Sequence, residues 1–195
     1  MDILRLGKFH YRVMNIVHFL GVTMYVIKTL LFFIATSIVL GVVFIYSGVY
    51  PMGADVPHNQ FTHHLLETLR EQSVKRAASS IEVPNLNDPD KLLMGGADYN
   101  DMCASCHLKP GKKQSDMSVG LYPAPPNLSI ENEQDESTLE ESSRQQFWII
   151  KHGIKASGMP AWGPTHDDDR IWAMVAFLQK LPSLTEDQYQ IITAR

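Results

Sequence analysis

The chain has 195 residues, of which 45% are hydrophobic and 19% charged, and its formal net charge is −4. This length allows one or two compact units. The small net charge argues against a nucleic-acid-binding protein, which usually carries a clustered basic face. The hydrophobic residues are concentrated near the N-terminus, so the average composition combines a membrane-like segment with an ordinary soluble remainder.

The first 50 residues predict a single membrane anchor. Residues 1–28 carry four basic side chains against one acidic side chain, and residues 29–50 carry no charge. A helix needs about 20 apolar residues to cross the hydrocarbon core. Because basic flanks stay on the cytoplasmic side, we expect residues 1–28 in the cytoplasm, residues 29–50 in the membrane and the rest outside. Residues 16–27 are apolar too, so the helix can begin several turns earlier.

A cleaved secretory signal is the alternative interpretation of this segment, since such signals also join a basic start to an apolar core. Against it, the apolar run is longer than the ~7–15 residues of a signal core, and no small-x-small cleavage site follows Tyr50. A lipoprotein anchor is excluded because no cysteine lies near this segment.

Residues 51–87 are predicted to form a tether with an amphipathic helix in the middle, over residues 61–78. Apolar side chains recur there at helix-like spacing. These side chains are Leu65, Leu66, Leu69 and Val74. Two interpretations stay open for this stripe: it packs on the domain that follows, which is the more ordinary outcome, or it meets a partner subunit.

Residues 88–182 are predicted to form a small helical domain. Asp88 offers an N-cap and Pro89 occupies the favoured first helical position. A helix is therefore expected to start there and to cover residues 91–106. Residues 110–127 are rich in proline and glycine and are expected to form an irregular loop.

Two further helices are expected in this domain. One ends near His152, where Gly153 stops it. The other covers residues 167–181 and is ended by Pro182, which leaves residues 183–195 as a C-terminal tail. No alternating β pattern occurs, so the predicted fold class is all-α, with one transmembrane helix followed by a small helical domain.

The two cysteines of the chain, Cys103 and Cys106, are followed directly by His107. Cysteines three positions apart lie on the same face of a helical turn, so both sulfurs can reach the two vinyl groups along one edge of a porphyrin. His107 then projects towards the ring centre, where its imidazole can bind iron. The motif therefore predicts one covalently bound haem c.

Other readings of the motif are weaker. A structural zinc site needs four ligands at short spacing, whereas His152 and His166 lie far apart in the chain. A thioredoxin-like redox pair is expected in a βαβ setting, which this stretch does not offer. A disulfide across two residues is strained and does not need a following histidine.

Three stretches together resemble a class I monohaem cytochrome c. They are the Cys-x-x-Cys-His motif, residues 121–128 with the sequence Leu-Tyr-Pro-Ala-Pro-Pro-Asn-Leu, and residues 157–162 with the sequence Ser-Gly-Met-Pro-Ala-Trp. The resemblance covers roughly half of the chain, over residues 91–182, and is similar to haem domains attached to bacterial respiratory complexes and haem-copper oxidases. It implies thioether attachment through both cysteines, His107 as proximal ligand and Met159 as distal ligand.

The same resemblance implies a carbonyl partner for the proximal histidine in the proline-rich loop, at Pro126 or at the neighbouring Pro125. It also implies that the first and last helices cross near a glycine and an aromatic residue. Gly96 and Tyr99, against Trp172 or Phe177, fit that description. The candidates for the wall of the haem pocket are Tyr122, Trp148, Ile149, Trp162 and Trp172.

Residue chemistry supports Met159 as the distal iron ligand independently of the resemblance. A thioether suits low-spin iron and raises the reduction potential relative to a second imidazole, and Met159 lies between glycine and proline in an irregular loop. Met117 is a weaker alternative, and His152 or His166 would be needed for a bis-histidine site. Met174 lies in the pattern of a helix and is expected in the core.

The function expected from these features is single-electron transfer, without enzymatic activity, between a quinol-oxidising complex or dehydrogenase and a terminal oxidase or reductase. The expected location is the bacterial cytoplasmic membrane, with the haem domain on the periplasmic side. The expected partners are redox proteins, in particular other subunits of a respiratory complex, with no nucleic acid and no small-molecule substrate. The alternative is a haem enzyme or gas sensor with an open distal iron position.

Overall fold

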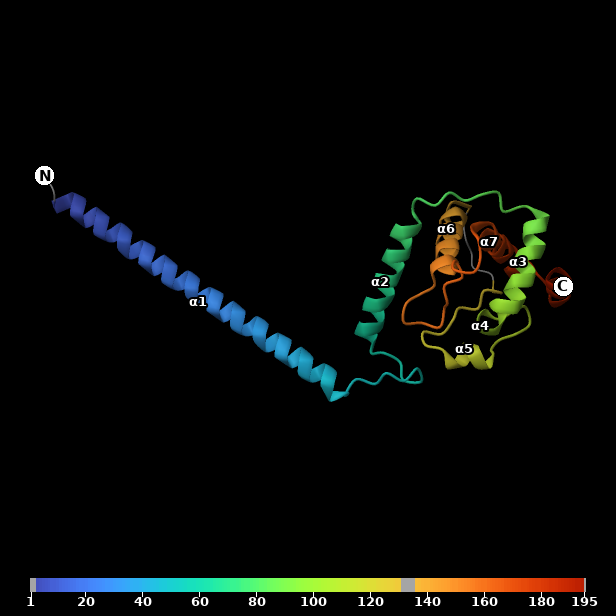
Figure 1. The fold of residues 1–195 in the computed structure, drawn as a ribbon, viewed down its shortest axis with the longest axis horizontal. Coiled ribbons are helices and arrows are strands. Elements are labelled where there is room, and N and C mark those ends of the chain that lie inside the picture. The colour runs from blue at the N-terminus through green and yellow to red at the C-terminus, as the bar shows by residue number, and fades with distance from the viewer. Residues whose placement is uncertain (1–2, 131–135, 195) are drawn as a thin grey trace. The chain divides into compact units, whose positions relative to one another are not determined.

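A computed structural model describes residues 3–130 and 136–194 (Figure 1). Every regular element in these ranges is helical, which confirms the all-α prediction. The chain divides into two compact units, Met1–Met52 and Gly53–Arg195.

The first unit is built on one long helix, α1, which covers Ile3–Ser47. Its part His18–Ser47 is long and apolar enough to cross a membrane. The hydroxyls of Thr23 and Thr29 donate to carbonyls one turn earlier, at 2.8 and 2.9 Å, so their polar groups are satisfied within the helix. The helix begins before residue 29, as the apolar upstream run allows, and it ends at Ser47. A helix of this length and composition serves as a membrane anchor or as a signal sequence.

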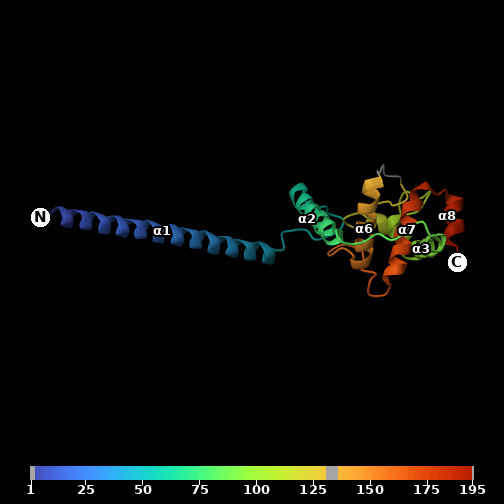
Figure 2. The ribbon, with the colours of Figure 1, turned by 90° about the horizontal axis from the view of Figure 1, so that it is seen from above.

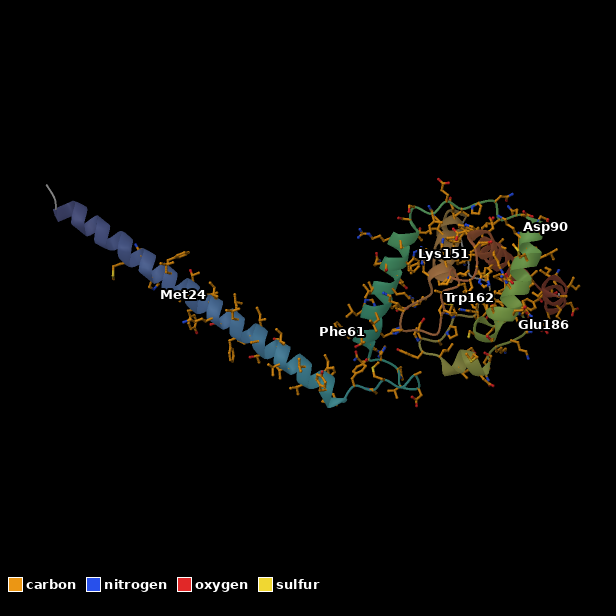
Figure 3. The ribbon with its side chains drawn as sticks, viewed as in Figure 1. Met24, Phe61, Asp90, Lys151, Trp162 and Glu186 are labelled. Carbon is orange, nitrogen blue, oxygen red and sulfur yellow. The ribbon has the colours of Figure 1, made fainter. Side chains whose placement is uncertain are left out.

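The second unit begins with α2, which covers Gln60–Ala78 and is capped by the side chain of Asn59. It packs against α6, Glu136–His152, and buries Val74 and Ala78. The other members of the predicted apolar stripe are exposed; they are Leu65, Leu66 and Leu69. Phe61, at the start of α2, is exposed as well (Figure 3). The helix therefore packs on its own domain through its C-terminal half.

The core of the second unit is the crossing of α3, Pro89–Met102, with α7, Asp168–Lys180. A Cβ atom on Gly95 would overlap the backbone carbonyl of Ala173, and one on Gly96 would lie 3.0 Å from the ring of Phe177. The two glycines therefore allow the backbones to approach closely.

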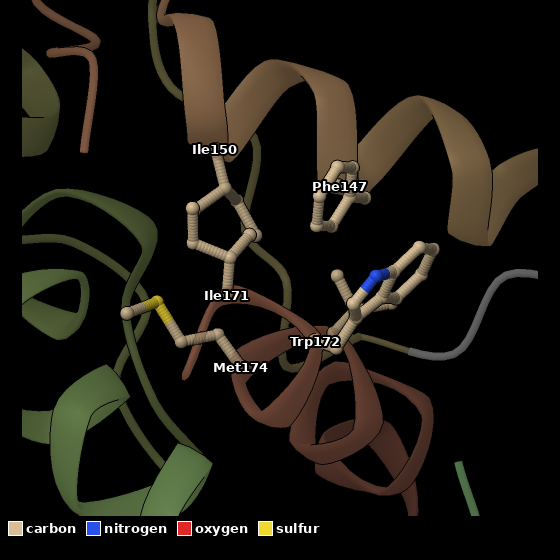
Figure 4. Packing of buried hydrophobic residues seen from close by; sticks show 6 residues of the cluster. Phe147, Ile150, Ile171, Trp172 and Met174 are labelled. Carbon is tan, nitrogen blue, oxygen red and sulfur yellow. The ribbon is translucent and has the colours of Figure 1, made fainter. Parts of the chain in front are cut away.

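Aromatic packing completes this crossing. The rings of Tyr99 and Phe177 lie 5.3 Å apart, so the predicted contact of Gly96 and Tyr99 with Phe177 is confirmed. The other expected partner, Trp172, faces α6 instead and stacks on Phe147 at 4.2 Å (Figure 4). Met174 is buried in the same cluster, as expected.

The remaining elements are short. They are α4, Ala104–His107, α5, Asp116–Gly120, the 3₁₀ turn η1, Leu181–Ser183, and α8, Glu186–Thr193. The helix predicted over residues 91–106 is thus interrupted at Cys103, which ends α3 and precedes α4.

Helix α8 lies in the segment that was expected to be a tail. It contacts α3, and its buried Tyr189 donates a hydrogen bond of 3.1 Å to the side chain of Asn100. Both views show α2, α6, α7 and α3 following one another across the second unit (Figure 2).

Candidate haem site

The Cys-x-x-Cys-His motif forms a tight turn at the end of α3. The carbonyl of Cys103 accepts hydrogen bonds from the backbone N–H groups of Cys106 and His107, at 3.0 and 2.8 Å. The hydroxyl of Tyr99, buried in the core, donates to the carbonyl of Leu108 at 2.7 Å. Leu108 has a φ of +66°, a conformation that a side chain disfavours. The turn is therefore held by the helix that precedes it.

His107 is oriented by the proline-rich loop. Its Nδ1 atom lies 2.9 Å from the carbonyl oxygen of Pro126. A carbonyl only accepts hydrogen bonds, so Nδ1 carries the proton and Nε2 keeps its lone pair. Burial lowers the pKa of His107, although the hydrogen bond to Pro126 acts in the opposite direction. The site thus presents a neutral imidazole, the form that binds metals.

Cys103 is a protonated thiol in this setting. Burial raises its pKa to about 12, and the carboxylate of Asp98 acts in the same direction. A reactive redox cysteine needs a lowered pKa, so the redox-pair alternative gains no support. Within the described ranges, no group of three or more His, Cys, Asp and Glu side chains could hold a metal ion.

A cavity of about 410 Å³ opens beside this turn, a size typical of ligand and cofactor pockets. Cys103, Cys106 and His107 line it, and Met159 and Trp162 line it as well. Pro125 and Pro126 contribute to another part of the lining. Two thiols, an imidazole and a thioether thus share one mostly apolar cavity, which is the donor set that a covalent haem requires.

The loop that carries Met159 is shaped by local hydrogen bonds. The Met159 N–H donates to the hydroxyl of Ser157 at 3.1 Å, and that hydroxyl donates to the carbonyl of Ile154 at 2.8 Å. Gly153 has a φ of +65°, and a Cβ atom there would lie 2.7 Å from the backbone of Ala161. The glycine that ends α6 therefore also lets the loop fold back on the helix end.

The alternative ligands lie elsewhere. Met117, His152 and His166 are not among the residues that line the cavity. His152 is exposed beside Trp148 at 4.9 Å, and His166 contacts the hydroxyl of Thr165 at 2.8 Å.

Tyr122, a candidate for the pocket wall, makes its contacts outside the cavity lining, and its place beside a haem stays a prediction. Its neighbours Leu121 and Pro123 line the cavity, whereas Tyr122 does not. Its hydroxyl accepts a hydrogen bond of 3.1 Å from the backbone N–H of His58, and the two rings lie 5.3 Å apart. Tyr122 therefore joins the proline-rich loop to the segment that leads into α2.

Some lining residues were not anticipated. Met102 of α3 packs against the core cluster and also lines the cavity. Arg70, Glu71 and Val74 of α2 line it as well. The apolar spacing of α2 was visible in the sequence, but it gave no signal that two charged side chains of this helix reach the cavity.

A helical domain in which a Cys-x-x-Cys-His turn and a methionine loop share one cavity is a cytochrome c domain, the class of single-electron carriers that hold haem covalently. Residues 91–178 match the family model described as "Cytochrome C oxidase, cbb3-type, subunit III". This segment is a cytochrome c domain of that family, preceded in the chain by a long apolar helix. No curated protein and no solved structure matches the chain. Membership of this family implies a covalent haem c.

Proposed function

We propose that this chain is a membrane-anchored monohaem cytochrome c that works as an electron-transfer subunit of a respiratory complex and not as an enzyme. It accepts electrons from a quinol-oxidising complex or dehydrogenase and delivers them to a terminal oxidase or reductase. The main observation behind the proposal is that four side chains line one cavity. They are the two cysteines, Met159 and a neutral His107 whose Nδ1 atom is hydrogen-bonded to Pro126.

Cys103 and Cys106 would hold the haem through thioethers, and His107 and Met159 would be its axial ligands. When bound, the haem supplies a one-electron couple. Pro126 fixes the imidazole ring and increases its basicity through the hydrogen bond at Nδ1. The Met159 sulfur favours the reduced state relative to a second imidazole. With a haem in the cavity, the largely apolar lining would limit the access of water to both ligands.

The apolar part of α1 supports the anchor. The basic excess before residue 29 supports a cytoplasmic N-terminus and a periplasmic haem domain, at the bacterial inner membrane. Anchoring would keep the haem domain at the membrane, where its effective concentration near membrane-bound redox partners is higher than that of a freely diffusing protein. Protease added from the cytoplasmic face of membrane vesicles is expected to spare the haem domain. Digestion from that face, or a mature chain lacking residues 1–50, would contradict the anchor.

The decisive experiment on the carrier role is carbon monoxide difference spectroscopy on the full chain in mild detergent. A carrier with both axial positions filled is expected to show a reduced c-type spectrum that carbon monoxide does not change. A haem enzyme or gas sensor with an open position would bind carbon monoxide when reduced. Identification of the proteins that co-purify in mild detergent then tests the assignment to a respiratory complex.

A further inference from the structure

Helix α2, which precedes the family-matched segment, contributes two charged side chains to the cavity lining. We propose that Arg70 of α2 binds a propionate of the haem, which makes α2 part of the cofactor site and not only a spacer between anchor and domain. This inference rests on the proposed haem site.

Contacts at both ends hold α2 beside the cavity. Near its C-terminal end, Val74 and Ala78 are only 5% and 1% exposed, and the helix packs against α6. Just before its N-terminal end, the N–H of His58 donates to the hydroxyl of Tyr122 in the proline-rich loop. Arg70 lies between these attachments, on a stretch of helix whose position is fixed.

The charges of the cavity lining point to an anionic ligand group at α2. Two lining side chains of this helix are charged, Arg70 and Glu71. Among the described residues of the lining, Arg70 is the only permanent cation. A haem carries two carboxylates, and a carboxylate next to an apolar cavity is costly unless it is paired. A guanidinium matches a carboxylate with two parallel hydrogen bonds.

The geometry of a porphyrin would place its carboxylates at the α2 end of the cavity. The propionates lie on the edge opposite the vinyl groups, and Cys103 and Cys106 would hold the vinyl edge. Helix α4, which contains Cys106, contacts α3, whereas α2 contacts α6. Both views show α3 and α2 at opposite ends of the row α2, α6, α7, α3 (Figures 1 and 2). Both α2 and the cysteines line the same cavity. A haem attached to the cysteines would therefore direct its propionate edge towards α2.

The present ion pairs of Arg70 leave its guanidinium available to bind a further carboxylate. Its Nη2 atom lies 3.5 Å from Glu71 Oε1 and 3.7 Å from Glu67 Oε1. These are long pairs between neighbouring, partly exposed side chains, and such pairs contribute little. Since the guanidinium has five donor groups, it can bind a propionate and keep Glu71 as a second partner.

The test compares Arg70→Gln with Arg76→Gln in the full chain. Arg76 is an exposed arginine of the same helix and does not line the cavity, so the control removes the same charge elsewhere. The readouts are the midpoint reduction potential and the propionate bending mode in the resonance Raman spectrum. Arg70→Gln is expected to lower the potential, because loss of a nearby positive charge favours ferric iron, and to shift the bending mode. Arg76→Gln should leave both readouts at wild-type values.

Arg70→Lys provides a second variant with the charge retained. It is expected to keep most of the wild-type potential, because the positive charge remains. It should still shift the bending mode, because an ammonium cannot form the two parallel hydrogen bonds that a guanidinium forms with a carboxylate. If Arg70→Gln and Arg76→Gln give the same potential and the same bending mode as the wild type, the inference is overturned while the haem assignment stands. If the wild-type chain carries no covalent haem on a denaturing gel, the proposed function itself fails.

Discussion

Asp98 on α3 and Arg170 on α7 are joined by two hydrogen bonds, of 2.6 and 2.9 Å, across the crossing of the two helices. The Asp98 carboxylate is buried, and the hydrogen bond to it is the main cause that raises the pKa of Arg170. This pair connects the helix that leads into the cysteine motif with the helix that follows the methionine loop.

We expect Arg170→Met to destabilise the second unit by about 3 kcal/mol, because it leaves a buried carboxylate without its two charge-assisted bonds. The measurement is the midpoint of urea unfolding. Arg144→Met is the matched control, since Arg144 pairs with exposed Glu140 at 3.8 Å, and it should cost less than about 0.5 kcal/mol. Equal effects of the two variants would show that the buried pair has no special role.

Replacement of Cys103 or Cys106 by alanine is expected to weaken haem retention, and the double replacement to abolish covalent attachment. Each thioether is one of two bonds that would hold the ring edge. Haem staining of a denaturing gel measures attachment, and Ser105→Ala, between the two cysteines, is the control. Normal haem content in the double variant would refute the motif assignment.

Met159→Ala is expected to open the sixth iron position while the haem stays attached. The variant should lose the methionine-to-iron charge-transfer band, bind carbon monoxide when reduced and have a lower potential, since a soft thioether favours ferrous iron. Met117→Ala is the control, because Met117 is exposed outside the cavity lining. If the Met159→Ala protein keeps the native spectrum and excludes carbon monoxide, the distal ligand is a residue other than Met159.

Gly95→Ala is expected to destabilise the second unit by about 3 kcal/mol, at the upper end of overpacking effects. The added methyl group would meet the backbone of Ala173, which cannot turn aside as a side chain can. Gly120→Ala introduces the same methyl group where nothing lies within 4 Å. Urea unfolding of both variants separates the steric effect from the general effect of replacing glycine. A Gly95→Ala protein as stable as Gly120→Ala would contradict the close approach.

Stability is expected to fall in alkaline solution. Burial raises the pKa of Tyr189 to about 12, whereas an unfolded tyrosine has a pKa of about 10. Above pH ~10 the unfolded state releases the proton while the folded state keeps it, so this contribution is complete below pH ~10 and is lost as pH rises towards 12. In the Tyr189→Phe variant, the urea concentration at the unfolding midpoint should fall less steeply as the pH rises from about 10 to about 12. An unchanged slope would exclude Tyr189 as the cause.

Local sequence signals predicted much of the cytochrome c domain. Asp88 caps α3 and Gly153 ends α6 as expected, because capping depends on residues within one turn. The spacing of Cys103 and His107 likewise reflects a single helical turn. The resemblance to class I cytochromes c implies a carbonyl partner for His107 at Pro126 or Pro125, and the structure contains the hydrogen bond with Pro126.

Contacts between distant segments could not be read in this way. Tyr122 is a sequence candidate for the pocket wall, and in the structure its hydroxyl accepts a hydrogen bond from the distant backbone N–H of His58. Helix α8 lay in an expected tail, and only its contact with α3 shows that Tyr189 belongs to the core. Arg70 reaches the cavity because α2 docks on α6. Each of these outcomes depends on which helix surfaces pack against one another. Several surfaces of similar apolar character compete for the same contacts, and a local pattern of residues does not predict which of them pack together.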